Sequence, residues 1–262
     1  MGARGAKTPG SNDGARRRAP PHALRPGAVS SGRTASLAVD WLSGTLAVFL
    51  NDARLELRSR VALGALALFV AAALVLLRLA LGRGAVDVAT AAALLWIVVV
   101  FASAVGLGRA FVAEEERGTA LLLRLHARPS QVFAGKLLFN AALMTALTLA
   151  AAGAFRVLVP TPLGSGALLA LTLVLGALGL AAASTLLSAL LARAQAAGPL
   201  LPVLSFPVVV PVLVPAVALT ELASGSPVGV WALARPDLTV LAAYAGLLVS
   251  ASFVLFDHVW AE

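Results

Sequence analysis

Long apolar runs separated by short polar segments dominate the pattern of this chain. After residue 60 the pattern contains six such runs, and a helix of about 20 apolar residues is long enough to cross a bilayer. The sequence therefore predicts an all-α integral membrane fold with six transmembrane helices. Their expected bounds are 61–81, 87–108, 132–156, 167–191, 199–220 and 237–257.

An amphipathic segment, 43–60, precedes the first run. Its apolar positions on one helical face are Leu46, Phe49, Leu50, Ala53 and Leu57. Asp52, Glu56 and Arg60 follow the spacing of another face. A marked apolar face on a segment of low overall hydrophobicity is typical of a helix that lies in the membrane interface. We predict such an interfacial helix, with the first turns of the following span as the alternative.

The composition supports membrane insertion and separates a basic tail from the rest. The chain is 60% hydrophobic and only 12% charged, whereas soluble domains have about a quarter of their residues charged. Residues 1–36 hold seven Lys and Arg residues against one Asp, and no aromatic residue. We predict a disordered tail over 1–40 and a membrane domain over 41–262. The basic tail suits an anionic membrane surface better than nucleic acid.

The distribution of Lys and Arg predicts the orientation. With the N-terminus inside, sixteen of these residues fall on the cytoplasmic side and four on the opposite side. An excess of Lys and Arg marks cytoplasmic loops. The segment between the second and third spans is therefore expected in the cytoplasm, and so are both termini.

The sequence offers no catalytic or metal centre. No Asp, Glu or Lys falls at a predicted mid-membrane position, where a charge would mark an ion path or proton relay. The chain has no cysteine, and its three histidines are not at metal-ligand spacing. No Walker A motif is present, so any energy that drives this protein would have to come from a partner or a gradient. Asn140 and Thr185 are among the uncharged polar residues expected to form interhelical hydrogen bonds or close packing.

Two of the predicted spans stand out for their residues: glycines in the fourth span and prolines in the fifth. Gly176 and Gly179 in the fourth span permit close helix approach. The fifth span contains five prolines, of which Pro207, Pro211 and Pro215 are four residues apart. Each proline removes a helical hydrogen bond. Either the helix is statically kinked for packing, or it deforms beside a translocation path, with Pro207 and Pro211 as candidate gating residues.

Residues 109–136, "RAFVAEEERGTALLLRLHARPSQVFAGK", join the second and third spans. Gly118 permits a break after three glutamates, and Thr119 can cap a short helix over about 120–127. Pro129 would end this helix, and Ser130 could cap the next. A short apolar and basic helix between two spans suits docking into the groove of a soluble partner. The alternative is a helix that rests on lipid.

Together these features resemble type-2 ABC exporter permeases, and most closely the family of cytochrome c maturation protein B, the heme exporter B subunit. The similarity covers about residues 50–262. The residues that carry it are Arg109, Phe111, the acidic cluster 114–116, Gly118, Thr119, "GK" at 135–136, Arg193, Gly198 and "FPVVVP" at 206–211.

The resemblance implies a transport subunit in the bacterial plasma (inner) membrane that is not itself an enzyme. Its partners would be a cytoplasmic ABC ATPase of the cytochrome c maturation protein A type, other maturation subunits, the heme chaperone and a second copy of this chain. Heme would be cargo, moved directly or in a chaperone that is released, and not a bound cofactor. The residues expected to couple to the ATPase are Glu115, Glu116, Gly118, Thr119, Leu121, Leu122, Arg124 and Arg128. Alternatives are export of a lipid, glycan or drug, or a scaffold without transport.

Overall fold

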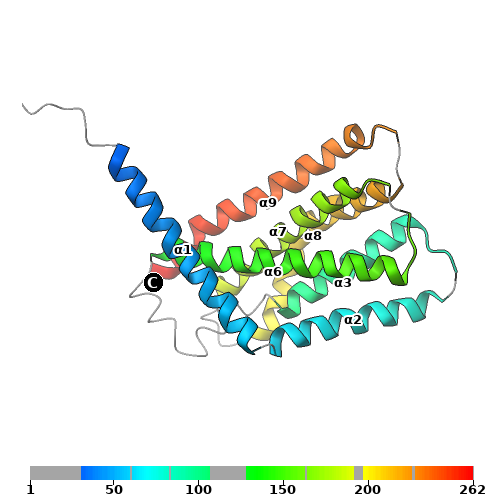
Figure 1. The fold of residues 1–262 in the computed structure, drawn as a ribbon, viewed down its shortest axis with the longest axis horizontal. Coiled ribbons are helices and arrows are strands. Elements are labelled where there is room, and N and C mark those ends of the chain that lie inside the picture. Colours follow the sequence, from blue (N-terminus) through cyan, green and yellow to red (C-terminus); the bar gives the residue numbers. More distant parts are fainter. Residues whose placement is uncertain are drawn as a thin grey trace, which may run out of the picture. The chain divides into compact units, whose positions relative to one another are not determined.

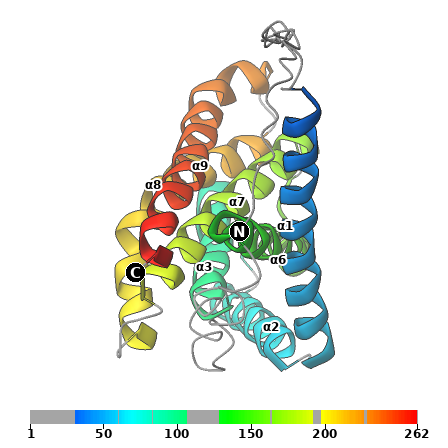
Figure 2. The same cartoon turned by 90° about the vertical axis from the view of Figure 1, so that its left-hand side faces the viewer.

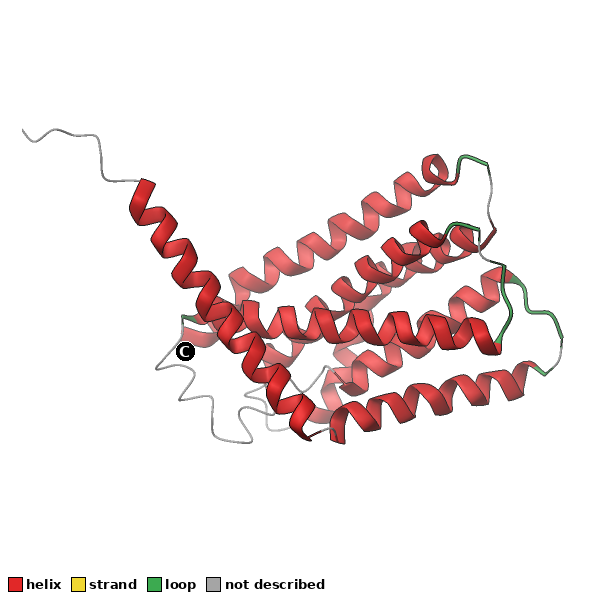
Figure 3. Ribbon diagram, viewed as in Figure 1, coloured by secondary structure: helices red, strands yellow, loops and turns green. Residues whose placement is uncertain are grey.

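In the part of the chain that the computed structural model describes, helices joined by loops are present and strands are absent (Figure 3). The described residues are 31–59, 61–82, 84–106, 128–162, 164–191, 197–225 and 228–261. Two compact units divide the chain, Met1–Ala38 and Val39–Glu262. In the first unit only the opening turns of helix α1, Ser31–Ser59, are described.

Six helices of the second unit lie side by side and alternate in direction along the chain (Figures 1 and 2). They are α2 (Val61–Leu81), α3 (Val88–Gly106), α6 (Pro129–Leu158), α7 (Gly166–Leu191), α8 (Ala197–Gly225) and α9 (Val230–Ala261). All except α3 are long and apolar enough to cross a bilayer. The searched stretch of α3 is apolar but shorter, Val88–Ala104. This is therefore a multi-pass membrane protein.

Two helices begin seven or more residues earlier than the sequence pattern predicts. The amphipathic helix, expected over 43–60, begins at Ser31, because residues 34–42 contain neither Pro nor Gly and so continue the helix. Helix α9, expected from 237, begins at Val230 with Pro236 inside it. Pro236 deprives the Ala232 carbonyl of its helical donor. Both residues are exposed near the helix end, where the loss is tolerated.

Helix α7 is the centre of the bundle and contacts α3, α6, α8 and α9. In the most apolar stretch of α7, 56% of the residues are buried, against 17% in the corresponding stretch of α2. The predicted close approach at its glycines is confirmed. A Cβ on Gly176 would overlap the ring of Trp96, and one on Gly179 would lie 3.1 Å from Val212. Trp96 itself is buried and its Nε1 donates to Thr220 Oγ1 at 2.9 Å.

Short loops join the helices at the end of the bundle remote from α1. Asp87 caps α3, because its Oδ2 accepts a hydrogen bond from the Thr90 backbone N–H at 2.9 Å. Hydrogen bonds from the Thr90 side chain and backbone hold the pKa of Asp87 below its ordinary value. The Ser165 N–H donates to the Ala223 carbonyl at 2.7 Å and ties the loop before α7 to the end of α8.

Candidate functional site

The structure describes only part of the residues that the sequence singles out. Most of the predicted ATPase-coupling residues lie outside the described part of the chain. They are Glu115, Glu116, Gly118, Thr119, Leu121, Leu122 and Arg124. Arg128, Pro207 and Pro211 are described. Because the segment 107–127 enters helix α6 at Arg128, the region that receives this segment is the candidate site.

The start of α6 differs from the sequence prediction in its capping. Arg128 is the residue before the first turn, with an extended backbone (φ −68°, ψ 145°), and Pro129 occupies the first turn. Proline is favoured there because its missing N–H has no helical partner in any case. Arg128 therefore has extended backbone just before α6, and the short helix expected over about 120–127 lies outside the described residues. Ser130 is not the cap.

Gln131 joins the start of α6 to α1. Its Oε1 accepts a hydrogen bond from the Arg128 N–H at 3.0 Å. Its Nε2 donates to the Asp40 carbonyl at 3.1 Å and approaches the Trp41 carbonyl at 3.5 Å. Beside it, Trp41 Nε1 donates to Ser130 Oγ at 3.1 Å. The side-chain amide of Gln131 thus connects Arg128, which directly follows the coupling segment 107–127, with the backbone of α1.

Two glycines let α1 and α6 approach closely where they cross. A Cβ on Gly135 of α6 would lie 2.6 Å from Val48 Cβ and 2.8 Å from the Thr45 carbonyl oxygen. A Cβ on Gly44 of α1 would lie 2.6 Å from Gln131 Nε2. Real Cβ atoms do not approach this closely, so an alanine at either position would push the helices apart or displace the Gln131 amide.

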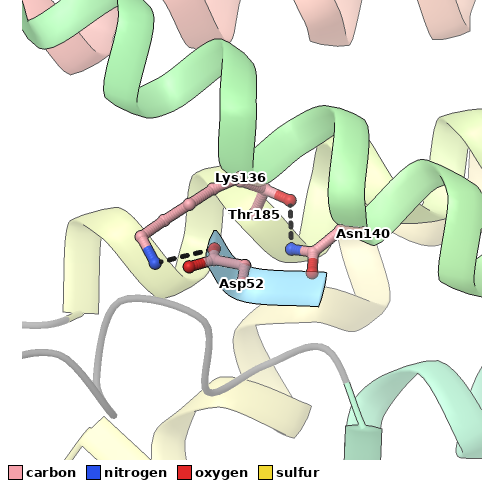
Figure 4. A network of polar contacts seen from close by, with 4 residues as sticks. All are labelled: Asp52, Lys136, Asn140 and Thr185. Atoms are coloured by element: carbon pink, nitrogen blue, oxygen red, sulfur yellow. Dashed lines mark hydrogen bonds and ion pairs between the residues drawn. The ribbon is translucent and has the colours of Figure 1, made fainter. Parts of the chain in front are cut away.

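A buried ion pair completes this contact (Figure 4). Lys136 Nζ of α6 lies 3.1 Å from Asp52 Oδ2 of α1, and the two side chains are 3% and 11% exposed. A buried ammonium group is very unfavourable unless it is paired and hydrogen-bonded. The sequence pattern marks Lys136 as a cytoplasmic charge and as part of "GK" at 135–136, but it does not predict the pair with Asp52. The available signal was a lysine inside an apolar run, opposite an amphipathic helix with an aspartate on its polar face.

One turn further along α6, a polar contact reaches the central helix. Asn140 Nδ2 donates to Thr185 Oγ1 of α7 at 2.8 Å, and Thr185 Oγ1 donates to the Ala181 carbonyl at 2.6 Å. Both side chains are buried and lie close to the ion pair in Figure 4. The interhelical hydrogen bond predicted for these residues is confirmed. Polar contacts therefore connect α1, α6 and α7.

The beginning of α6 is enclosed on every side. Seven consecutive residues, Gln131–Leu137, are all buried, which is nearly two helical turns. On the side of α9, the ring of Phe133 lies 5.1 Å from that of Phe253 and 4.9 Å from that of Phe256, measured between centroids. Such aromatic contacts at 4.5–7 Å are favourable. This part of α6 is held by its neighbours all round.

The proline-rich α8 is one continuous helix over Ala197–Gly225. Along it Pro207 is exposed, Pro211 is half-buried and Pro215 is buried. Because Pro211 and Pro215 lack N–H groups, the carbonyls of Pro207 and Pro211 have no helical donor. The hydroxyl of Tyr244 on α9 donates to the adjacent Val208 carbonyl at 3.1 Å. This hydrogen bond from a neighbouring helix lies next to the two carbonyls without a helical donor, and neighbouring helices help to stabilise proline-containing membrane helices.

Nothing in the described residues forms a metal centre, since no three His, Asp or Glu side chains there gather closely enough to hold an ion. A comparison with protein families finds a match to the family described as CcmB protein, over residues 44–256. This range includes α1 from Gly44, the whole segment 107–127 and all of α8. No curated protein matches the chain.

Proposed function

Because this chain belongs to the CcmB family, the heme exporter B subunits of cytochrome c maturation, we propose that it is the membrane permease subunit of an ABC transporter complex. The family match over 44–256 is the observation that carries this proposal. Membership of the family supports a role in heme export and cytochrome c biogenesis, and the apolar helices support an inner-membrane location. The permease supplies the membrane path, and a separate cytoplasmic ATPase supplies the energy.

In this proposal α3 is the sixth span of a type-2 permease fold. Its 19 residues extend about 28 Å at a rise of 1.5 Å per residue, close to the thickness of the hydrocarbon core. With six spans and the Lys and Arg asymmetry of the sequence, both termini and the segment 107–127 are cytoplasmic. Two copies of the chain meet around a two-fold axis, which is the commonest symmetry of such assemblies.

The coupling segment transmits ATP-driven closure of the ATPase to the spans. The predicted short helix over about 120–127 docks on the ATPase, and its movement reaches the membrane through Arg128 and the start of α6. Support for this route comes from the Arg128 backbone, whose N–H bonds to Gln131 within the first turn of α6. The result is either direct heme transfer toward a chaperone on the outer face or release of the heme-loaded chaperone.

Reversal of two coupling charges tests this function. We expect Arg124→Glu with Arg128→Glu to reduce co-purification of the ATPase in mild detergent to about a tenth or less, because like charges facing each other across an interface cost several kcal/mol. Arg235→Glu is the control, since Arg235 is exposed like Arg128 but lies near the N-terminus of α9 at the other end of the bundle (Figure 1). ATPase recovery at the wild-type level in the double variant would refute docking at this segment. A purified complex without any ATPase or heme-handling subunit would refute the proposed function itself.

A further inference from the structure

The contact between Val39–Ser59 of α1 and the start of α6 is fixed at two separate levels. Gln131 binds the carbonyls of Asp40 and Trp41 at one level, and Lys136 pairs with Asp52 at the other. These levels are eleven or twelve residues apart on α1, or about 17 Å at 1.5 Å per residue. Two anchor points so far apart prevent α1 from pivoting about either one.

Close packing between the two levels prevents sliding as well. Val48 and the Thr45 carbonyl lie directly against Gly135, which has no side chain to keep α1 away from the α6 backbone. A shift of α1 along α6 would drive the Val48 side chain into the α6 backbone. Because packed interfaces have discrete arrangements and do not deform continuously, the two helices are expected to hold one register.

The enclosed start of α6 transmits movement from the preceding segment. Arg128 is hydrogen-bonded to Gln131, the same residue that binds α1. A displacement that arrives at Arg128 therefore acts on α1 and α6 together. Leu42, Leu46 and Leu50 of α1 are exposed and take no part in this contact between α1 and α6.

We infer that Val39–Ser59 of α1 and the first turns of α6 move as one rigid body during transport, and that Asp52, Lys136 and Gln131 are the positioning residues that unite them. This inference rests on the proposed function, because it assumes that movement arrives through the segment before Arg128. The inference adds α1 to the helices that move during transport, so that the amphipathic helix moves with α6 and does not stay fixed in the membrane. A hinged α1 that swings independently of α6 is the competing mechanism.

A covalent bridge separates these mechanisms. The natural chain has no cysteine, so Phe49→Cys on α1 and Phe139→Cys on α6 can be joined specifically with a short bifunctional thiol reagent. Their rings are in edge-to-face contact with centroids 6.4 Å apart. The reaction is carried out on the assembled complex with its ATPase, after folding. Each single-cysteine variant treated with the same reagent is the control.

The rigid-body proposal predicts that the bridged complex keeps at least about half of its heme delivery per ATP hydrolysed. Asp52→Asn without the bridge should lower this coupling ratio about two- to thirtyfold, the range reported for residues that carry coupling between sites. The bridge should then restore the ratio in Asp52→Asn, because it replaces the lost ion pair. A merely structural role of Asp52 would not give such rescue after folding is complete.

Loss of heme delivery on bridging an active complex would overturn the inference, because α1 would then have to move relative to α6. Full coupling in unbridged Asp52→Asn would overturn the role of the ion pair. An unbridged complex that lacks the ATPase or delivers no heme contradicts the proposed function instead. In the chain purified alone, Asp52→Asn should lower the bridging yield at least about twofold if the pair holds the joint, and an unchanged yield would contradict the joint without reference to cargo.

Discussion

The contact between Gly176 and Trp96 shows how a single missing side chain determines packing in this bundle. The indole ring occupies the space in which a Cβ on Gly176 would lie, and the indole N–H is satisfied by Thr220 on a third helix. The ring therefore connects α3, α7 and α8. In lipid, where apolar side chains gain little from burial away from the tails, such close contacts and interhelical hydrogen bonds are what hold helices together.

We expect Gly176→Ala to destabilise the protein by about 1–3 kcal/mol, because the added methyl group forces Trp96 out of its position. Gly153→Ala is the control. Gly153 also lies within a helix, but a Cβ there would meet nothing within 4 Å, so better helix propensity should leave stability unchanged or raise it slightly. The measurement is the thermal transition of the purified chain in mild detergent. A Gly176→Ala variant that melts at or above the wild-type temperature would contradict this packing.

Single residues also show where prediction from sequence fails. Lys136 and Asp52 are 84 positions apart, and no local pattern couples them. Periodicity placed Asp52 on the polar face of an amphipathic helix, but it did not reveal that this face meets α6. A glycine in an apolar run permits a close approach without showing that one occurs: Gly176 and Gly179 lie against neighbouring helices, whereas a Cβ on Gly153 would meet nothing within 4 Å. Which residue fills the space is decided only by tertiary packing.

At the scale of elements, α8 is the helix whose properties depend most on its neighbours. Its prolines leave carbonyls without helical donors, and Tyr244 of α9 donates to the backbone at Val208 beside them. Fewer internal hydrogen bonds make the segment around Pro207 and Pro211 easier to bend than an ordinary span. Phe206, just before Pro207, also packs edge to face against Phe101 of α3, with ring centroids 6.5 Å apart. Bending of α8 at this segment would therefore change its contacts with both α3 and α9.

Changing Pro207 and Pro211 together to Ala should reduce holocytochrome c formation by about an order of magnitude while the complex still assembles, because a regular helix resists the deformation that transport requires. The readouts are holocytochrome c yield in cells and recovery of the ATPase with the chain. Pro236→Ala is the matched control, since Pro236 also lies inside a helix but is exposed near the end of α9. A normal cytochrome yield from the double variant would assign these prolines to static packing.

The sequence pattern predicted the helices better than their ends. Continuous apolar runs determine where a chain can enter lipid, and all six expected runs correspond to observed helices. The predicted starts of α1 and α9 were wrong. A helix continues through polar residues, and through an exposed proline, as long as its backbone groups still find hydrogen-bond partners. The predicted cap of α6 was wrong because Pro129 occupies the first turn and Arg128 the position before it, so that Ser130 already lies inside the helix.

At the scale of the whole molecule, the absence of cysteine makes the transmembrane arrangement directly testable. The proposed six-span arrangement places Gly84 and Val228 outside and Arg54 and Arg128 in the cytoplasm. All four positions are exposed. The comparison of Gly84 with Arg128 is decisive for α3, because these positions lie on opposite sides of the membrane only if α3 crosses it. Val228 and Arg54 report the orientation of the remaining helices independently.

We expect a membrane-impermeant maleimide to label Gly84→Cys and Val228→Cys in intact spheroplasts, and to label Arg54→Cys and Arg128→Cys only after permeabilisation. The wild-type chain, which has no thiol, is the background control. Labelling of both Gly84→Cys and Arg128→Cys in intact spheroplasts would remove α3 from the set of spans and would also move the coupling segment away from any cytoplasmic ATPase. A fully inverted pattern would keep six spans but overturn the orientation, because the Lys and Arg asymmetry that predicts it would then face the wrong side. Only the expected pattern leaves the start of α6 where an ATPase can act on it.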